Sequence, residues 1–301
     1  MASAGSAPPT ASDGSVVRYA IAVVVTVVAI LSQYFLPQNV PALIPVYTSL
    51  PGDLFIVYGI PVIAFALLVG AGPLRRWRVR MGTATVDGLA FYAAATIVTL
   101  AVLAAMVVVY EALDPSALQL LSRQNPALTQ AAGDPWFWVG FSFVIGAFEE
   151  TIFRGWVYGF WRNRVSNWLG PAIATSALFA GLHLYYGTTY GAAAPLIFPG
   201  LFLLGFAFAA TYQTSGGNLV VVALLHGLYD AAAFLTLVDT DLGLLVRYLP
   251  VVIGLVLLLV RFLGKGSGAA LPPIPTFPSP SPPAFPSPAA PSLPPPPPPS
   301  F

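Results

Sequence analysis

The chain has 301 residues, of which 57% are hydrophobic and only 8% are charged. This composition excludes an ordinary water-soluble domain and indicates that lipid is much of the protein's solvent. Twelve basic residues balance eleven acidic ones, so we expect no nucleic-acid partner. Cysteine is absent, which excludes disulfides, thiolate metal sites and a cysteine nucleophile; imidazole chemistry must use His183 or His226.

The two ends of the chain are predicted to be disordered tails. Residues 1–16 are rich in Ala, Ser and Pro and lack the basic segment of a cleavable secretory signal. Residues 265–301 form a proline-rich tail, which cannot pack as a helix. A polyproline ligand for a partner domain is the alternative to a solvated, extended tail. Residues 17–264 are predicted to form one transmembrane helical domain.

Apolar stretches of about the 20 residues that a spanning helix needs recur along this domain. We therefore predict an all-α, polytopic transmembrane helical bundle of about eight spans. The predicted spans lie near 19–36, 54–72, 88–110, 136–160, 169–186, 195–212, 217–237 and 244–263. We found no convincing internal repeat, so the sequence gives no support to a transporter built from inverted repeats.

The basic residues predict the orientation, because cytoplasmic loops are enriched in Lys and Arg. With both termini in the cytoplasm, only Arg123 and Arg247 fall outside, and Arg154 lies within a span. The other nine are then cytoplasmic: Arg18, Arg75, Arg76, Arg78, Arg80, Arg162, Arg164, Arg261 and Lys265. We expect a multi-pass protein of the cell membrane with this topology.

The span at 136–160 contains Glu149, Glu150 and Arg154. Each costs roughly 2.5 to 3.5 kcal/mol at the centre of a membrane helix, so three together indicate a functional site. Glu150 and Arg154 are four residues apart and are predicted to form a structural ion pair on one helix face. Glu149, rotated by about 100°, is expected to stay unpaired and to act as a general base.

Two histidines lie in later spans. His183 follows Phe179 among small and apolar residues; it could be a hydrogen-bonded core residue, although its predicted depth in the membrane favours function. His226 and Asp230 are four residues apart on one helix face, in a span that Asn218 opens. The alternative for this pair is a His–Asp contact that only holds helices together.

Gly227, beside His226, leaves room for a substrate backbone or a facing helix.

Glu149, His183, His226 and Asp230 are each predicted near the middle of a span, so they can form one inward-facing cluster that activates water. Without a metal, Glu149 assisted by His183 would take a proton from water, and His226 would stabilise the oxyanion. With a metal, the two imidazoles and a carboxylate, from Glu149 or Asp230, would ligate Zn²⁺. The spacing leaves both versions open.

Three fragments resemble the signature of the CAAX-protease and bacteriocin-processing (CPBP, or Abi) family, which includes the type II CAAX prenyl endopeptidases. They are Glu-Glu-x-x-x-Arg at 149–154, Phe-x-x-x-His at 179–183 and His-x-x-x-Asp at 226–230. The resemblance covers a catalytic core of about residues 136–238. It implies an all-helical fold with a catalytic chamber inside the membrane.

By this resemblance, the chain is an intramembrane protease that cleaves a membrane-associated or lipid-modified peptide substrate. Glu149 matches the water-activating glutamate, His183 its partner and His226 the oxyanion histidine, with Glu150 and Arg154 in supporting roles. Asp230 departs from the Asn of many members. A different class of function, a non-catalytic membrane carrier or scaffold that uses the same cluster for protons or ions, is the alternative.

Overall fold

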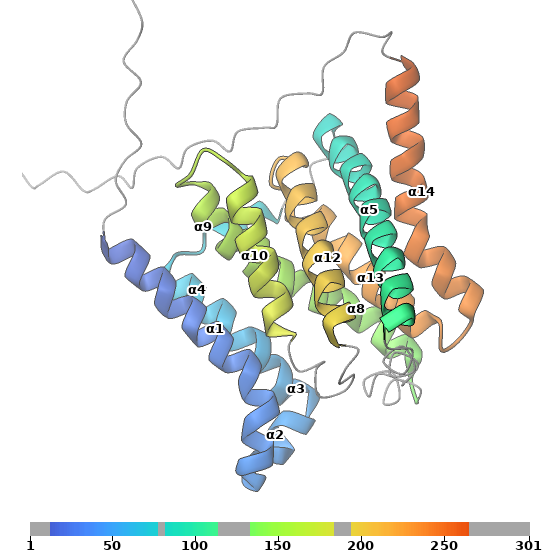
Figure 1. The fold of residues 1–301 in the computed structure, drawn as a ribbon. Helices are drawn as coiled ribbons and strands as arrows, with labels where there is room; N and C mark the ends of the chain where they lie inside the picture. The colour runs from blue at the N-terminus through green and yellow to red at the C-terminus, as the bar shows by residue number, and fades with distance from the viewer. Residues whose placement is uncertain (1–12, 78–81, 114–132, 184–193, 265–301) are drawn as a thin grey trace, which may run out of the picture.

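The computed structural model describes residues 13–77, 82–113, 133–183 and 194–264. Within these ranges every regular element is a helix, as predicted, and none is a strand. Figure 1 shows the helices as a single bundle of tilted rods.

The N-terminal part of the bundle is a helical hairpin. It runs through α1 (Asp13–Asn39), η1 (Pro41–Leu43), α2 (Ile44–Thr48), α3 (Leu50–Leu54), the π-helix η2 (Phe55–Gly59) and α4 (Ile60–Leu68). The short helix η3 (Gly72–Arg76) leads on to α5 (Thr83–Leu113).

The remaining elements contain the predicted site residues, except that His183 directly follows α10. They are α8 (Pro135–Glu150), the π-helix η4 (Thr151–Tyr158), α9 (Gly159–Arg162), α10 (Leu169–Leu182), α12 (Ala194–Thr214), α13 (Leu219–Leu235) and α14 (Thr240–Gly264).

Six helical segments of the described chain are long and apolar enough to cross a membrane. They start near the residues predicted for spans one to four, six and eight. The fifth and seventh predicted spans are the shorter helices Leu169–Leu182 and Leu219–Leu235. At 1.5 Å per residue, these reach about 21 and 26 Å, less than the roughly 30 Å hydrocarbon core. The described structure thus has six candidate spans, where the sequence predicts eight.

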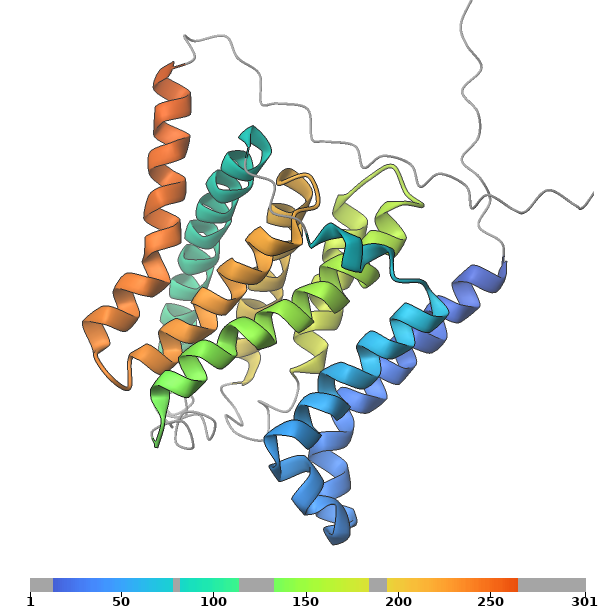
Figure 2. The same ribbon diagram turned by 180° about the vertical axis from the view of Figure 1, so that it is seen from behind.

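Helices α8 and α13 pack closely against each other at the centre of the bundle. A Cβ added at Gly146 would lie 2.9 Å from Gly227 N, and one added at Gly227 would lie 2.6 Å from Phe143 Cδ1. Small residues at such a crossing allow membrane helices to approach closely. Of the two uses predicted for Gly227, the facing helix is the one the structure contains. Figure 2 shows α8 and η4 between the α1–α4 hairpin and α13.

The described ends of the chain, the start of α1 and the end of α14, lie at the same end of the bundle (Figure 1). Helix α1 begins at Asp13, so residues 13–16 belong to a helix and not to the predicted N-terminal tail. Residues 1–12 and the proline-rich tail at 265–301 lie outside the described residues.

Candidate active site

The backbone changes from an α-helix to a π-helix directly after the two glutamates. Helix α8 ends at Glu150, and η4 continues as a π-helix from Thr151 to Tyr158. All eight η4 residues are buried. Wider helical turns of this kind are rare and are often found at functional sites. The sequence predicted one uninterrupted span here and contained no signal for the change in helical winding.

Glu150 and Arg154 form the predicted ion pair. Arg154 Nη1 donates to Glu150 Oε1 over 2.8 Å, and both side chains are fully buried. Arg154 Nη2 also donates to the carbonyl oxygen of Gly205 in α12, over 2.7 Å. The guanidinium lies 5.1 Å from the ring centroid of Phe179 and 5.3 Å from that of Phe208. The cation is therefore stabilised by a carboxylate, a carbonyl and aromatic faces in place of water.

His226 is held by carboxylates on both sides of its ring. Its Nδ1 lies 2.7 Å from Glu150 Oε1, while its Nε2 lies 3.5 Å from Asp230 Oδ2 and 3.7 Å from Glu149 Oε2. Ionised carboxylates only accept hydrogen bonds, so the ring donates from both nitrogens only as an imidazolium. Phe208 stacks on the ring at a centroid distance of 4.8 Å. The orientation of His226 is thus determined by α8, α12 and its own helix.

Glu149 was predicted to stay unpaired, but in the structure it has two partners. Besides the contact with His226, its Oε1 accepts a hydrogen bond of 3.2 Å from Tyr58 Oη. Tyr58 comes from the π-helix η2, 91 residues earlier, and stacks on Phe148 at 5.5 Å. Sequence reasoning missed Tyr58 because a single tyrosine in an apolar span has no spacing that links it to α8.

His183 lies at the end of a helix, which corrects the prediction that it sits near the middle of a span. It is the C-cap residue of α10, and its Nδ1 donates to the Phe179 carbonyl oxygen over 2.7 Å. A carbonyl cannot donate, so in the neutral ring Nε2 is left as the acceptor. The Phe179 ring lies 4.8 Å from the His183 ring and 5.9 Å from the His226 ring. Phe179 therefore packs against both histidines.

In the part of the chain that the structure describes, no group of three or more His, Cys, Asp or Glu side chains is arranged to hold a metal ion. In the described residues, the predicted zinc set of Glu149, His183, His226 and Asp230 is therefore not arranged as a group of metal ligands.

The described contacts bring Glu149, Glu150, Arg154, His226 and Asp230 into one connected group, with His183 approaching through Phe179. A carboxylate and an imidazole whose polar atoms lie 3.7 Å apart can both contact one small molecule beside them. The predicted cluster is thus assembled in large part, from helices distant in sequence.

Comparison with known proteins identifies the same segment. Residues 131–232 match the model of a family described as Type II CAAX prenyl endopeptidase Rce1-like. No curated protein and no solved structure matches the chain. The match contains Glu149, Glu150, Arg154, His226 and Asp230, as well as His183. The chain is thus an integral membrane protein whose residues 131–232 are similar to the Rce1-like type II CAAX prenyl endopeptidase family, in the segment that contains the three motifs.

Proposed function

We propose that this protein is an intramembrane endopeptidase. Its substrate would be a membrane-associated peptide or protein, and prenylated chain ends are the class that the name of the matched family suggests. The observation that carries the proposal is the approach of Glu149 Oε2 to His226 Nε2, at 3.7 Å, inside the family-matched segment. No comparable match favours the carrier or scaffold alternative.

In the proposed reaction, Glu149 takes a proton from a water molecule, assisted by His183, while the water oxygen attacks the scissile carbonyl. His226 donates from Nε2 to the oxyanion that forms. Glu149 then passes its proton to the leaving nitrogen as the C–N bond breaks. The products are a carboxylic acid and an amine, so atoms and protons balance.

The neighbouring groups have supporting roles in this proposal. Glu150 accepts from Nδ1 of His226, which turns Nε2 toward Glu149. Arg154 neutralises Glu150, so that the carboxylate can stay charged when buried. Asp230, 3.5 Å from the same Nε2, cannot donate to an oxyanion while ionised and therefore orients His226.

The decisive experiment is cleavage of a fluorescent peptide anchored in vesicles that contain the purified protein. We expect Glu149→Gln to lower the cleavage rate by about 10² to 10⁴-fold, the usual contribution of a general base. Asp241→Asn is the matched control, because Asp241 is an exposed acid in the first turn of α14. Equal rates for the parent and Glu149→Gln disprove the mechanism, and ion flux through vesicles without any cleavage supports the carrier.

The zinc version of the mechanism and the predicted topology have separate tests. The zinc version requires bound metal in stoichiometric amount, which elemental analysis of the purified protein measures; full cleavage by metal-free protein rejects it.

The proposed location is the cell membrane with both termini cytoplasmic. Tags at either end should then resist protease added to intact cells, and cleavage of either tag from outside contradicts the topology.

A further inference from the structure

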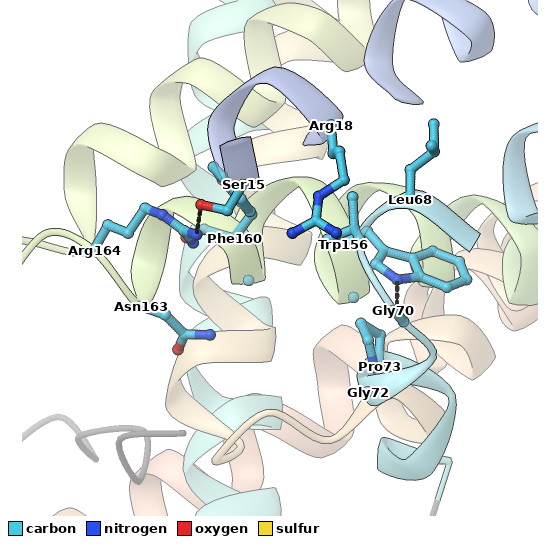
Figure 3. A pocket seen from close by; sticks show the side chains of 13 residues that line it. Ser15, Arg18, Leu68, Gly70, Gly72, Pro73, Trp156, Phe160, Asn163 and Arg164 are labelled. Atoms are coloured by element: carbon cyan, nitrogen blue, oxygen red, sulfur yellow. Dashed lines mark hydrogen bonds between the residues drawn. The ribbon is translucent and has the colours of Figure 1, made fainter. Parts of the chain in front are cut away.

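A pocket of about 320 Å³ lies where several helices end, and neither Glu149 nor Glu150 is among its lining residues (Figure 3). It is formed where α1 begins, where α4 passes into η3, and along η4 and α9. Its polar lining comes from Ser15, Arg18, Asn163 and Arg164.

Glycines allow the backbone segments that line this pocket to pack closely. Gly70 has φ +109°, which favours glycine, and its carbonyl oxygen accepts from Trp156 Nε1 over 2.8 Å. A Cβ at Gly155 would lie 3.0 Å from Pro73 Cβ, so a glycine there favours the close approach of η4 to η3. The pocket is therefore built by packed backbone and not by a loose surface loop.

Arg164 is held rigidly at the pocket wall. Its guanidinium carbon lies 3.4 Å from the centroid of the Phe160 ring. Nη1 donates to the Phe160 carbonyl oxygen over 2.8 Å, and Nη2 donates to Ser15 Oγ over 3.2 Å. Partial burial lowers the pKa of Arg164, because desolvation disfavours the charged form. A bound anion would offset that cost.

Arg18 supplies a second cation to the same pocket. Its Nε donates to the carbonyl oxygen of Gly14 in its own helix, and its side chain is exposed. Among the side chains that the structure describes, no carboxylate forms an ion pair with Arg18 or Arg164. Two guanidiniums therefore line one pocket with no described acid to neutralise them.

The pocket is at the depth of the lipid headgroups. The candidate spans Gly14–Pro37, Leu50–Leu68 and Pro135–Arg162 each have one end at this pocket. Nearby, Trp161 Nε1 donates to Tyr19 Oη over 3.1 Å. Tryptophan and tyrosine concentrate at the membrane–water interface, and spanning helices end there.

We propose that this pocket binds the phosphate of an anionic phospholipid, with Arg18 and Arg164 as its cationic ligands. Arginine presents paired donors that match phosphate oxygens. Ser15 and Asn163 add polar groups at the rim. The depth of the pocket favours a lipid over a soluble phosphate, because the acyl chains of a lipid bound here continue alongside the exposed apolar residues of the spans.

Native mass spectrometry of the full-length protein with added phosphatidylglycerol tests the proposal. We expect about one tightly bound phosphatidylglycerol per chain and roughly tenfold weaker binding to Arg18→Gln, the loss of about one charge-assisted hydrogen bond. Arg75→Gln is the matched control, since Arg75 lies in neighbouring η3, is exposed and does not line the pocket. Arg164→Lys, which keeps the charge but loses the fork of donors, should bind less tightly than the parent.

Thermal unfolding in detergent distinguishes a bound lipid from free phosphate. It also shows whether each variant is folded. Phosphatidylglycerol should raise the unfolding temperature of the parent and of Arg75→Gln, but raise that of Arg18→Gln less. Equal protection of Arg18→Gln and the parent overturns the site. Equal protection of the parent by inorganic phosphate, or by phosphatidylcholine, at the same concentration overturns the assignment to an anionic lipid.

Discussion

Helices α13 and α14 follow one another in the chain and pack together, yet they differ in what they contact. Helix α13 has 17 residues, of which nine are buried, including His226 and Leu225. The 25-residue α14 exposes a long series of apolar side chains, among them Val252, Leu259 and Val260. One helix is therefore central to the protein, and the other presents its surface to lipid.

The comparison teaches that the apolar length of a helix does not by itself show how much the helix contributes to the candidate site. Helix α14 meets the criteria for a membrane span, whereas α13 is too short for them. Helix α13 nevertheless buries polar and small residues such as His226 and Gly227, because protein and not lipid surrounds that part of the helix.

The buried ion pair gives the largest expected effect. Arg154→Met leaves Glu150 charged and without its guanidinium partner in a fully buried position. Loss of one partner of a buried pair costs about 3 to 5 kcal/mol of the free energy of unfolding. Denaturant unfolding in detergent measures the change. A variant as stable as the parent would show that the pair does not stabilise the centre of the bundle.

A matched pair of leucines compares α13 with α14 directly. Leu225 is 4% exposed and Leu259 is 56% exposed. We expect Leu225→Ala to cost about 2 to 5 kcal/mol through the cavity it leaves, and Leu259→Ala to cost under about 0.5 kcal/mol. Both variants are compared by the same unfolding assay. Equal losses would contradict the assignment of α14 to the lipid-facing side.

Two glycines of α8 test the close approach to α13. A Cβ at Gly146 would meet backbone atoms of Ala223 and Gly227 at 2.9 Å, whereas one at Gly140 would have no atom within 4 Å. Gly146→Ala should therefore destabilise the protein by about 1 to 3 kcal/mol through overpacking. Gly140→Ala should be neutral or stabilise it by up to about 1 kcal/mol, because alanine favours the helix. An unfolding temperature of Gly146→Ala equal to or above that of Gly140→Ala would contradict the close approach of α8 to α13.

Tyr58→Phe has the smallest expected effect on stability and tests a contact between the hairpin and the site. It removes only the hydroxyl that donates to Glu149 Oε1. Since this hydroxyl orients Glu149, we expect peptide cleavage to fall by roughly tenfold, less than the 10² to 10⁴-fold contribution of a general base itself. The unfolding temperature should change little. Cleavage at the parent rate would leave Tyr58 as a packing residue.

The helical class and the Glu150–Arg154 pair could be predicted from the sequence, because both depend on local spacing. The i, i+4 relation places those two side chains together in any helix, and their contact is as predicted. The same spacing of four residues predicted that His226 and Asp230 share a helix face, and they lie in contact. This reasoning from spacing failed for Glu149, since the hydroxyl of Tyr58 reaches it from 91 residues away.

The sequence by itself determined that this is a helical membrane protein, and which few polar residues it buries there, because apolar length and the cost of charge in lipid are properties of each segment alone. Tertiary structure alone decided that Glu150 holds His226, that His183 caps the end of a helix and that two arginines share one pocket. These features depend on how helices cross and where they end, which is determined by close packing between distant segments.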